Sequence, residues 1–241
     1  MSKYTIPKLR KHWAPNAAAF QRRETECRTL FAHLAECGSL AIEALAGKKE
    51  LEPNCAFLLL SKSLNHALSA QLLLEHGMMV DAALCARNAI EAMLLLELLV
   101  KQPDLCQQWS KGKEFKPADV RQRLEKLPRV EVRDIIIETS PNEHDDARFV
   151  YGWLSRITHA NLESLNYSTS RASAANDFVI HIGGAHSPPT TRIVAASIGR
   201  VFARTVPCAL GAYATSVLEE SARDFERIGS AATALAKKAN A

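Results

Sequence analysis

A long apolar helix is the feature of this sequence that most restricts its fold. Residues 78–100 contain neither Pro nor Gly and are rich in Ala, Leu, Met and Glu, all strong helix formers. Apolar residues line two faces of this predicted helix, so we expect it to lie at the centre of a bundle, surrounded on most sides. Four charged residues interrupt the run, which is therefore not a membrane span: Asp81, Arg87, Glu91 and Glu97.

Arg87 and Glu91 lie one turn apart on a face of this helix where leucine would be expected. One interpretation is a structural ion pair that fixes the helix register. The other is one wall of a polar site inside the bundle. If the pair is sealed in the core, Arg87→Ala should destabilise the fold by about 3–5 kcal/mol, because Glu91 would become an unpaired buried charge.

Composition favours a helical protein. The chain has 241 residues, of which 47% are hydrophobic, with only 10 Gly and 10 Pro. We predict an all-α fold, an antiparallel helical bundle with extra helices. Residues 1–14 should form an irregular basic arm, residues 15–228 a single bundle domain, and residues 229–241 a frayed tail. A strand pattern at residues 178–182 predicts a small β-hairpin or flap near residues 175–184.

Turn residues divide the chain into helices. Gly47 and Gly77 should each end a helix, and Pro207 should kink one. The predicted helices span residues 15–46, 54–76, 78–100, 102–109, 117–127, 145–165 and 190–226. Residues 131–138 fit a helix or a strand, and we favour a short helix there.

The N-terminal sequence lacks the apolar segment of a signal peptide. The six cysteines form no C-x-x-C pair and mostly lie in apolar helical surroundings, which is typical of reduced thiols. We therefore expect a cytoplasmic protein. Residues 1–28 hold seven Lys/Arg against two Glu; this basic segment could contact phosphate or could be an ordinary solvated surface.

Several catalytic classes are poor candidates. The sequence has no phosphate-binding glycine loop of the P-loop or dinucleotide type, no G-x-S-x-G elbow and no H-E-x-x-H zinc motif. His181 and His186 lack Cys or carboxylate partners at ligand spacing, so we expect no metal. No cofactor is expected either.

The remaining polar constellation comprises Arg87, Glu91, Arg156 and His159. A histidine can act as general base or acid near neutral pH, and an arginine can stabilise a developing phosphorane charge. Metal-free RNA cleavage needs these two functions. The alternative is that His159 packs or caps inside the bundle. Candidate binding residues beside this constellation are Ser155, Asn88 and His66.

Three sequence features together resemble a known group of proteins. They are the stretch A-L-C-A-R-N-A-I-E of residues 83–91, the later Y-G-W-L-S-R-I-T-H of residues 151–159, and a Gly-Gly turn before the last helix. They are similar to uncharacterised bacterial all-α proteins related to the HEPN superfamily (higher eukaryotes and prokaryotes nucleotide-binding). The resemblance spans about residues 55–215. It implies a helical bundle, often dimeric. Some members are metal-independent ribonucleases of toxin–antitoxin and phage-defence systems, and others are non-catalytic binding modules.

The sequence departs from the catalytic pattern of that superfamily. Catalytic members place four to six residues between Arg and His, whereas Arg156 and His159 have two between them. Arg28 and His33 fit the spacing but lie on the first helix, where the motif is not expected. Two hypotheses follow: a HEPN-like ribonuclease acting on RNA, or a non-catalytic module that binds a protein or a nucleotide. Either could be a homodimer, and neither involves a membrane.

Overall fold

The computed structural model describes residues 6–127, 154, 169–171, 178–180 and 187–239. Apart from two three-residue strands, the regular structure in these parts of the chain is helical, which confirms the all-α class. The elements are α1 (Ile6–Arg23), α2 (Thr25–Leu45), α3 (Leu51–Glu75), α4 (Met79–Lys101), α5 (Asp104–Ser110), α6 (Pro117–Lys126), β1 (Thr169–Arg171), β2 (Phe178–Ile180), α9 (Pro188–Tyr213) and α10 (Thr215–Ala239).

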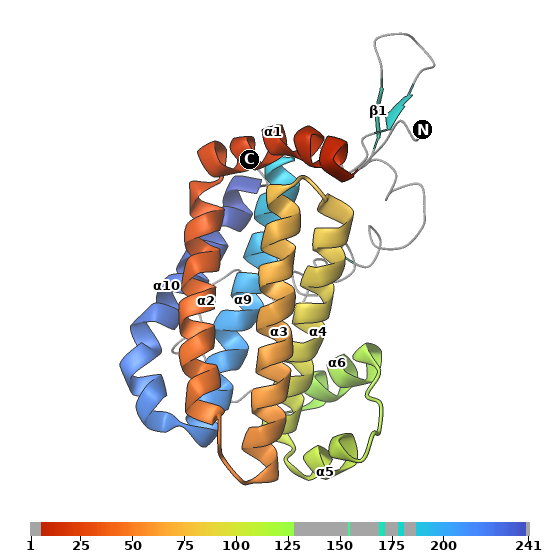
Figure 1. Ribbon diagram of the computed structural model, residues 1–241. Helices are drawn as coiled ribbons and strands as arrows, with labels where there is room; N and C mark the ends of the chain where they lie inside the picture. Colours follow the sequence, from red (N-terminus) through yellow and green to blue (C-terminus); the bar gives the residue numbers. More distant parts are fainter. Residues whose placement is uncertain (1–5, 128–153, 155–168, 172–177, 181–186, 240–241) are drawn as a thin grey trace.

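Five long helices, α2, α3, α4, α9 and α10, pack lengthwise into the bundle (Figure 1). α1 crosses one end of it, and α5 and α6 lie at the other end. α4 packs against both α3 and α9. α4 and α9 run in the same direction, because Thr191 meets Met79 near their starts and Arg204 meets Glu97 near their ends. α2 also runs in this direction beside α9, because Glu24 meets Arg192 near the starts of both helices. The core therefore contains parallel as well as antiparallel helix neighbours.

The hairpin of α3 and α4 agrees with the sequence prediction. Gly77 joins the two helices with a φ of 79°, a conformation that favours glycine. Across the hairpin, the hydroxyl of Ser63 donates a hydrogen bond to the carbonyl of Ala89 over 3.1 Å. The predicted helices over residues 54–76 and 78–100 are thus confirmed within a few residues at their ends.

One face of α4 is buried as expected and the other is not. Ala83, Ala86, Ile90 and Met93 are at most 4% exposed. The face that carries Arg87 and Glu91 also carries Leu84, which is 44% exposed. The expectation that α4 is surrounded on most sides therefore needs correction for this face, which reaches the surface.

The N-terminal predictions were wrong at two points. Residues 6–14 are helical rather than irregular, because α1 begins at Ile6 and continues through Pro15. The single helix over residues 15–46 is divided at Glu24, whose φ of −111° and ψ of 43° end α1. Phe20 is fully buried and the carboxylate of Glu24 turns inward, so contacts with the bundle hold α1 across its end.

The C-terminal predictions were also wrong. No helix continues from residue 190 to 226, since Ala214, with a φ of −153° and a ψ of 58°, ends α9. Pro207 lies buried within α9, and α10 returns antiparallel beside it (Figure 1). The tail after residue 228 is not frayed as far as Ala239, because Ala232 and Leu235 pack in the core, at 0% and 1% exposed.

The two strands pair antiparallel, with Ser170 opposite Val179. β2 lies inside the range predicted for a hairpin or flap, and β1 precedes that range. The segments 172–177 and 181–186 lie outside the described residues, so the flap stays a prediction. The predicted helices over 131–138 and 145–165 also lie outside them, apart from Leu154, which is fully buried in the core.

α9 is the one helix in the described parts of the chain that is long and apolar enough to cross a membrane. However, 72% of its apolar stretch is buried inside the bundle. A long apolar helix that is mostly buried in this way is typical of the core of a soluble protein.

Candidate functional site

The Arg87–Glu91 pair forms within α4. The Nε of Arg87 donates to Oε1 of Glu91 over 2.9 Å, and the two side chains are 24% and 23% exposed. The pair is thus neither sealed in the core nor fully solvated. Solvent therefore reaches this face of α4, which it would not do if the pair were sealed in the core.

Two of the candidate binding residues, Asn88 and His66, lie on helices of the described structure. Asn88 is half-buried on α4 and follows Arg87, about 100° further around the helix. His66 is half-buried on α3, one turn beyond Ser63, and hence at the level of Ala86 on α4. Burial lowers the pKa of His66, and the charge of Lys62 lowers it further. His66 is therefore a neutral imidazole at pH 7, able to accept or donate one hydrogen bond.

The remaining candidates, Ser155, Arg156 and His159, lie outside the described residues. Leu154, which directly precedes Ser155, is fully buried in the core. This contact ties the segment to the bundle at one residue. The convergence of Arg156 and His159 with Arg87 stays a prediction.

Arg28 and His33, which match the superfamily spacing, do not share a face of α2. Five residues along a helix correspond to about 140° of rotation. Arg28 is exposed and donates to the carbonyl of Gln21 over 3.0 Å. His33 is half-buried, and its Nδ1 atom has no hydrogen-bond partner among the described residues. The spacing alone therefore assembles no site on α2.

The sequence reasoning missed a more deeply buried ionic cluster around Glu97. The carboxylate of Glu97 contacts the Nζ of Lys101 at 2.7 Å and Arg204 at 3.0 Å, joining α4 to α9. Burial alone would raise the pKa of Glu97, but Arg204 and Lys101 outweigh it and hold the pKa below its ordinary value. The signal was present in the sequence, since Lys101 follows Glu97 by four residues, as Glu91 follows Arg87.

A second buried pair was also missed. Glu24, 2% exposed, binds Arg192 through both oxygens, with Nε–Oε2 and Nη2–Oε1 distances of 3.2 and 3.4 Å. Cys27 lies 3.7 Å from the same carboxylate. Burial and the charge of Glu24 raise the pKa of Cys27 to about 12, so this thiol is not a nucleophile at neutral pH. No sequence signal links positions 168 residues apart.

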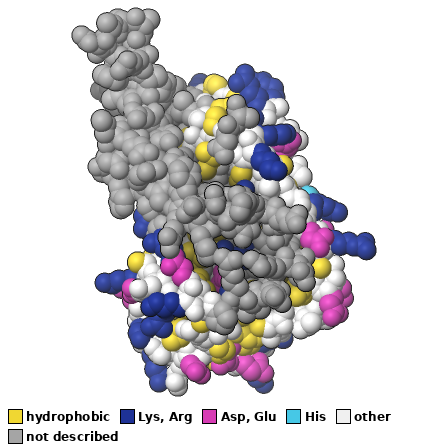
Figure 2. Space-filling view, turned by 180° about the vertical axis from the view of Figure 1, so that it is seen from behind, with side chains coloured by type: hydrophobic (Ala, Val, Ile, Leu, Met, Phe, Trp, Pro, Cys, Tyr) yellow, Lys and Arg dark blue, Asp and Glu magenta, His cyan; other side chains and the backbone are white. Residues whose placement is uncertain are grey.

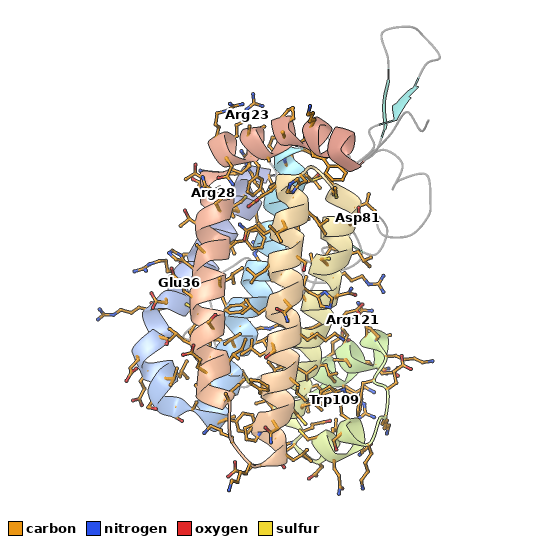
Figure 3. The ribbon with its side chains drawn as sticks, viewed as in Figure 1. Arg23, Arg28, Glu36, Asp81, Trp109 and Arg121 are labelled. Carbon is orange, nitrogen blue, oxygen red and sulfur yellow. The ribbon has the colours of Figure 1, made fainter. Side chains whose placement is uncertain are left out.

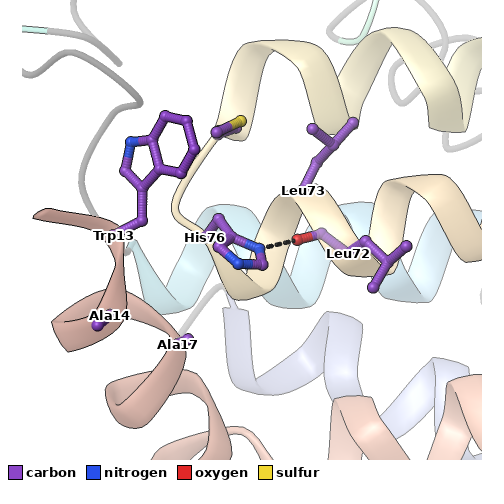
Figure 4. A pocket seen from close by; sticks show the side chains of 7 residues that line it. Trp13, Ala14, Ala17, Leu72, Leu73 and His76 are labelled. Atoms are coloured by element: carbon purple, nitrogen blue, oxygen red, sulfur yellow. Dashed lines mark hydrogen bonds between the residues drawn. The ribbon is translucent and has the colours of Figure 1, made fainter. Parts of the chain in front are cut away.

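A mostly apolar cleft of about 520 Å³ lies between α1 and the α3–α4 turn (Figure 4). The Nδ1 atom of His76 is 2.8 Å from the carbonyl of Leu72, so this nitrogen carries the proton in the neutral ring and Nε2 is the acceptor. Trp13 meets His76 edge-on, with ring centres 6.3 Å apart. The cleft is lined by Trp13, Ala14, Ala17, Leu72, Leu73, His76 and Met78.

Within the described residues, no group of three His, Cys, Asp or Glu side chains could hold a metal ion. The six cysteines form no disulfide, and four of them are buried, as the sequence indicated. Burial raises the pKa of Cys106 to about 12. The thiols thus serve as small apolar core residues.

Comparison with known protein families gives a match over the segment that contains α4. Residues 54–145 match a family of unknown function (DUF5677). This similarity covers α3 to α6 and less than half of the chain. No curated protein and no solved structure matched. The chain is therefore similar, over these helices, to an uncharacterised family.

The exposure of the Arg87–Glu91 pair changes the expected cost of removing it. We expect Arg87→Ala to lower the free energy of unfolding by about 1 kcal/mol, not 3–5, because solvent screens a pair that is about one quarter exposed. Urea denaturation of Arg87→Ala, Glu91→Gln and the double variant would measure this cost and the coupling energy. A loss of unfolding free energy above about 3 kcal/mol would contradict this expectation, because it would show that Glu91 is left as an unpaired buried charge.

Proposed function

We propose that this chain is a HEPN-like helical-bundle protein that cleaves RNA without a metal ion or other cofactor. The observation that supports the proposal best is the partial exposure of Arg87 on the central helix α4. A guanidinium that is held by a carboxylate yet reached by solvent is suited to binding phosphate.

The proposed roles follow from the chemistry of each group. Glu91 bonds Nε of Arg87 and fixes the plane of its guanidinium. His159 takes the proton of a ribose 2′-hydroxyl, whose oxygen then attacks the neighbouring phosphorus. The bond from phosphorus to the 5′-oxygen breaks, the leaving oxygen takes up a proton from water, and a 2′,3′-cyclic phosphate remains. Arg87 and Arg156 stabilise the charge that develops on the phosphoryl oxygens.

Ser155, Asn88 and His66 would bind the substrate by hydrogen bonds. Burial and the charge of Lys62 lower the pKa of His66, so its ring is neutral and can both accept and donate a hydrogen bond. In the cell, such an activity would make the chain a cytoplasmic toxin-type effector, of the kind that acts in toxin–antitoxin or phage-defence systems.

The second candidate function is a non-catalytic module that binds a protein or a nucleotide. Two observations favour it. The cleft beside Trp13 and His76 is mostly apolar and has a size common in ligand sites. In addition, Leu58 and Leu72 on α3 are 55% and 59% exposed, and a protein partner or a second copy of the chain would cover them.

His159→Ala separates the two functions. We expect this variant to lose at least about 100-fold in the rate of RNA cleavage, because the general base is removed. Its melting temperature should stay within a few degrees of the wild-type value. The assay follows a labelled single-stranded RNA on denaturing gels in the presence of EDTA.

Arg28→Ala is the matched control for His159→Ala. Arg28 is exposed and lies on α2, and we expect it to take no part in the reaction. Equal cleavage by wild type and His159→Ala would refute the role of His159. A His159→Ala variant that fails to fold, together with a wild type that cuts no RNA, would favour the binding module.

A further inference from the structure

α1 carries charge of one sign only. Its 18 residues, IPKLRKHWAPNAAAFQRR, contain five Lys/Arg and no Asp or Glu. Three of these cations, Lys11, Arg22 and Arg23, are exposed in the structure. Figure 3 shows Arg23 on the outer side of α1, at the end of the bundle. In the view from behind, Lys and Arg side chains are visible at this end, as they are along the side and toward the opposite end (Figure 2).

The carboxylates nearest in sequence do not offset this charge. Glu24 is buried and bound to Arg192. Glu26 is paired with Lys238 of α10. The side chains of Lys11, Arg22 and Arg23 therefore face solvent, and neither of these two carboxylates is paired with them. Such a surface attracts polyanions.

The two faces of α1 have opposite characters. Trp13, Ala17, Phe20 and Glu24 follow one another at helical spacing and point into the bundle, where Phe20 and Glu24 are buried. Lys11, Pro15, Ala18 and Arg22 form the opposite stripe, and all four are exposed. The two cations thus lie at the ends of this stripe, and Pro15 and Ala18 lie between them. Eleven residues of helix separate Lys11 from Arg22 by about 16 Å.

We propose that this outward stripe, together with Arg23, docks the phosphodiester backbone of RNA. A span of about 16 Å accommodates a few consecutive phosphates, and the small residues between its ends let the backbone approach closely. The inference rests on the proposed function, since it takes RNA as the polymer that the chain acts on. It assigns to α1 a docking role at the end of the bundle.

An anionic membrane is the other polyanionic surface that a basic helix could meet. Membrane-bound helices bury an apolar face in the lipid. The bulky apolar residues of the described part of α1 are instead turned into the bundle, as full burial of Phe20 shows. The outward stripe also has no aromatic residue on which a base could stack. The structure therefore favours sequence-independent binding to phosphates.

The triple variant Lys11→Gln/Arg22→Gln/Arg23→Gln tests the proposal in the His159→Ala background, which we expect to bind RNA without cutting it. Fluorescence anisotropy with a labelled 20-nucleotide RNA would give Kd between 50 and 200 mM KCl. We expect Kd to rise at least tenfold, and the slope of log Kd against log salt to fall by about 2, since three phosphate contacts are lost. If the triple variant melts at a different temperature from its parent, the same affinity measurement would be made with the double variant Arg22→Gln/Arg23→Gln.

The matched control replaces three exposed lysines at the opposite end of the bundle, Lys49, Lys111 and Lys116, with Gln. We expect less than a twofold change in Kd for this control. Three results would each overturn the proposal. RNA affinity could fall equally in both variants, the parent protein could fail to bind RNA, or the parent protein could bind phosphatidylserine vesicles more tightly than RNA. RNA bound through α1 by a chain that never cuts would refute the nuclease alone. RNA cut by the wild type, but bound by the α1 variant as tightly as by its His159→Ala parent, would refute the docking surface alone.

Discussion

Replacing Glu97 with Ala is expected to lower the free energy of unfolding by about 3 kcal/mol. The carboxylate is only 7% exposed and lies between Lys101 and Arg204. Its removal leaves two cations close together in a poorly solvated position, and breaking a buried pair in this way costs about 3–5 kcal/mol. The lower end of that range applies because Arg204 is 36% exposed.

The contribution of Glu97 should depend on pH in a defined direction. Its pKa in the folded protein lies below the ordinary value of 4.5, so its stabilisation is present above that value and is lost as pH falls through the folded pKa. The difference in stability between wild type and Glu97→Gln should therefore be largest near pH 7 and shrink below about pH 4.5.

Guanidinium denaturation at several pH values would measure both effects. Glu220→Ala is the control, because Glu220 is exposed on α10 and should change stability by less than about 0.5 kcal/mol. A Glu97→Ala variant as stable as the wild type would show that the contact between α4 and α9 is not ionic in solution.

Replacing Gly199 with Val is expected to cost about 3 kcal/mol. A Cβ atom at this position would lie 2.9 Å from the Cβ of Ala232 and 3.1 Å from a methyl group of Leu30. The two further methyl groups of Val would press on α10 and α2, and overpacking of this kind costs about 1–3 kcal/mol or more. The gain in helix propensity over Gly, about 0.5 kcal/mol, offsets little of this.

Gly211→Val in the same helix is the matched control for Gly199→Val. Gly211 is exposed, and a Cβ there would meet only Leu218, at an ordinary distance of 3.4 Å. We expect this variant to be neutral or slightly stabilised in thermal denaturation. Similar melting temperatures for the two variants would contradict the return of α10 along α9.

Helix ends marked by glycine were predictable from the sequence. Gly47 and Gly77 have φ values of 75° and 79°, and each ends a helix as predicted. Local chemistry decides such positions, because few residues other than glycine adopt this conformation without strain. The core helix α4 was predictable for a similar reason, since its composition and periodicity agree over more than six turns.

Helix breaks without glycine or proline were not predictable. α1 ends at Glu24 because that carboxylate binds Arg192, which is 168 residues away in the sequence. α9 ends at Ala214 because α10 packs back along it, and Pro207 is accommodated inside the helix. These positions are decided by tertiary contacts that override local propensity.

The candidate site was predictable in part. The pairing of Arg87 with Glu91 follows from their spacing on a helix. Their exposure does not, because periodicity places a residue on a face but does not reveal what covers that face. Leu84 illustrates this, since it lies on the same apolar stripe and is 44% exposed. The same spacing rule would have found Glu97 and Lys101, but not Arg204 on α9.

The ends of the RNA products test the central claim most directly. The wild-type chain, in EDTA, would be given a single-stranded RNA and the same sequence with every 2′-hydroxyl replaced by hydrogen. Attack by a 2′-oxygen predicts cleavage of the first strand only, with products that carry a 2′,3′-cyclic phosphate, identified by mass spectrometry. Two results would contradict the proposal: an intact RNA, or cleavage of the strand that lacks 2′-hydroxyls.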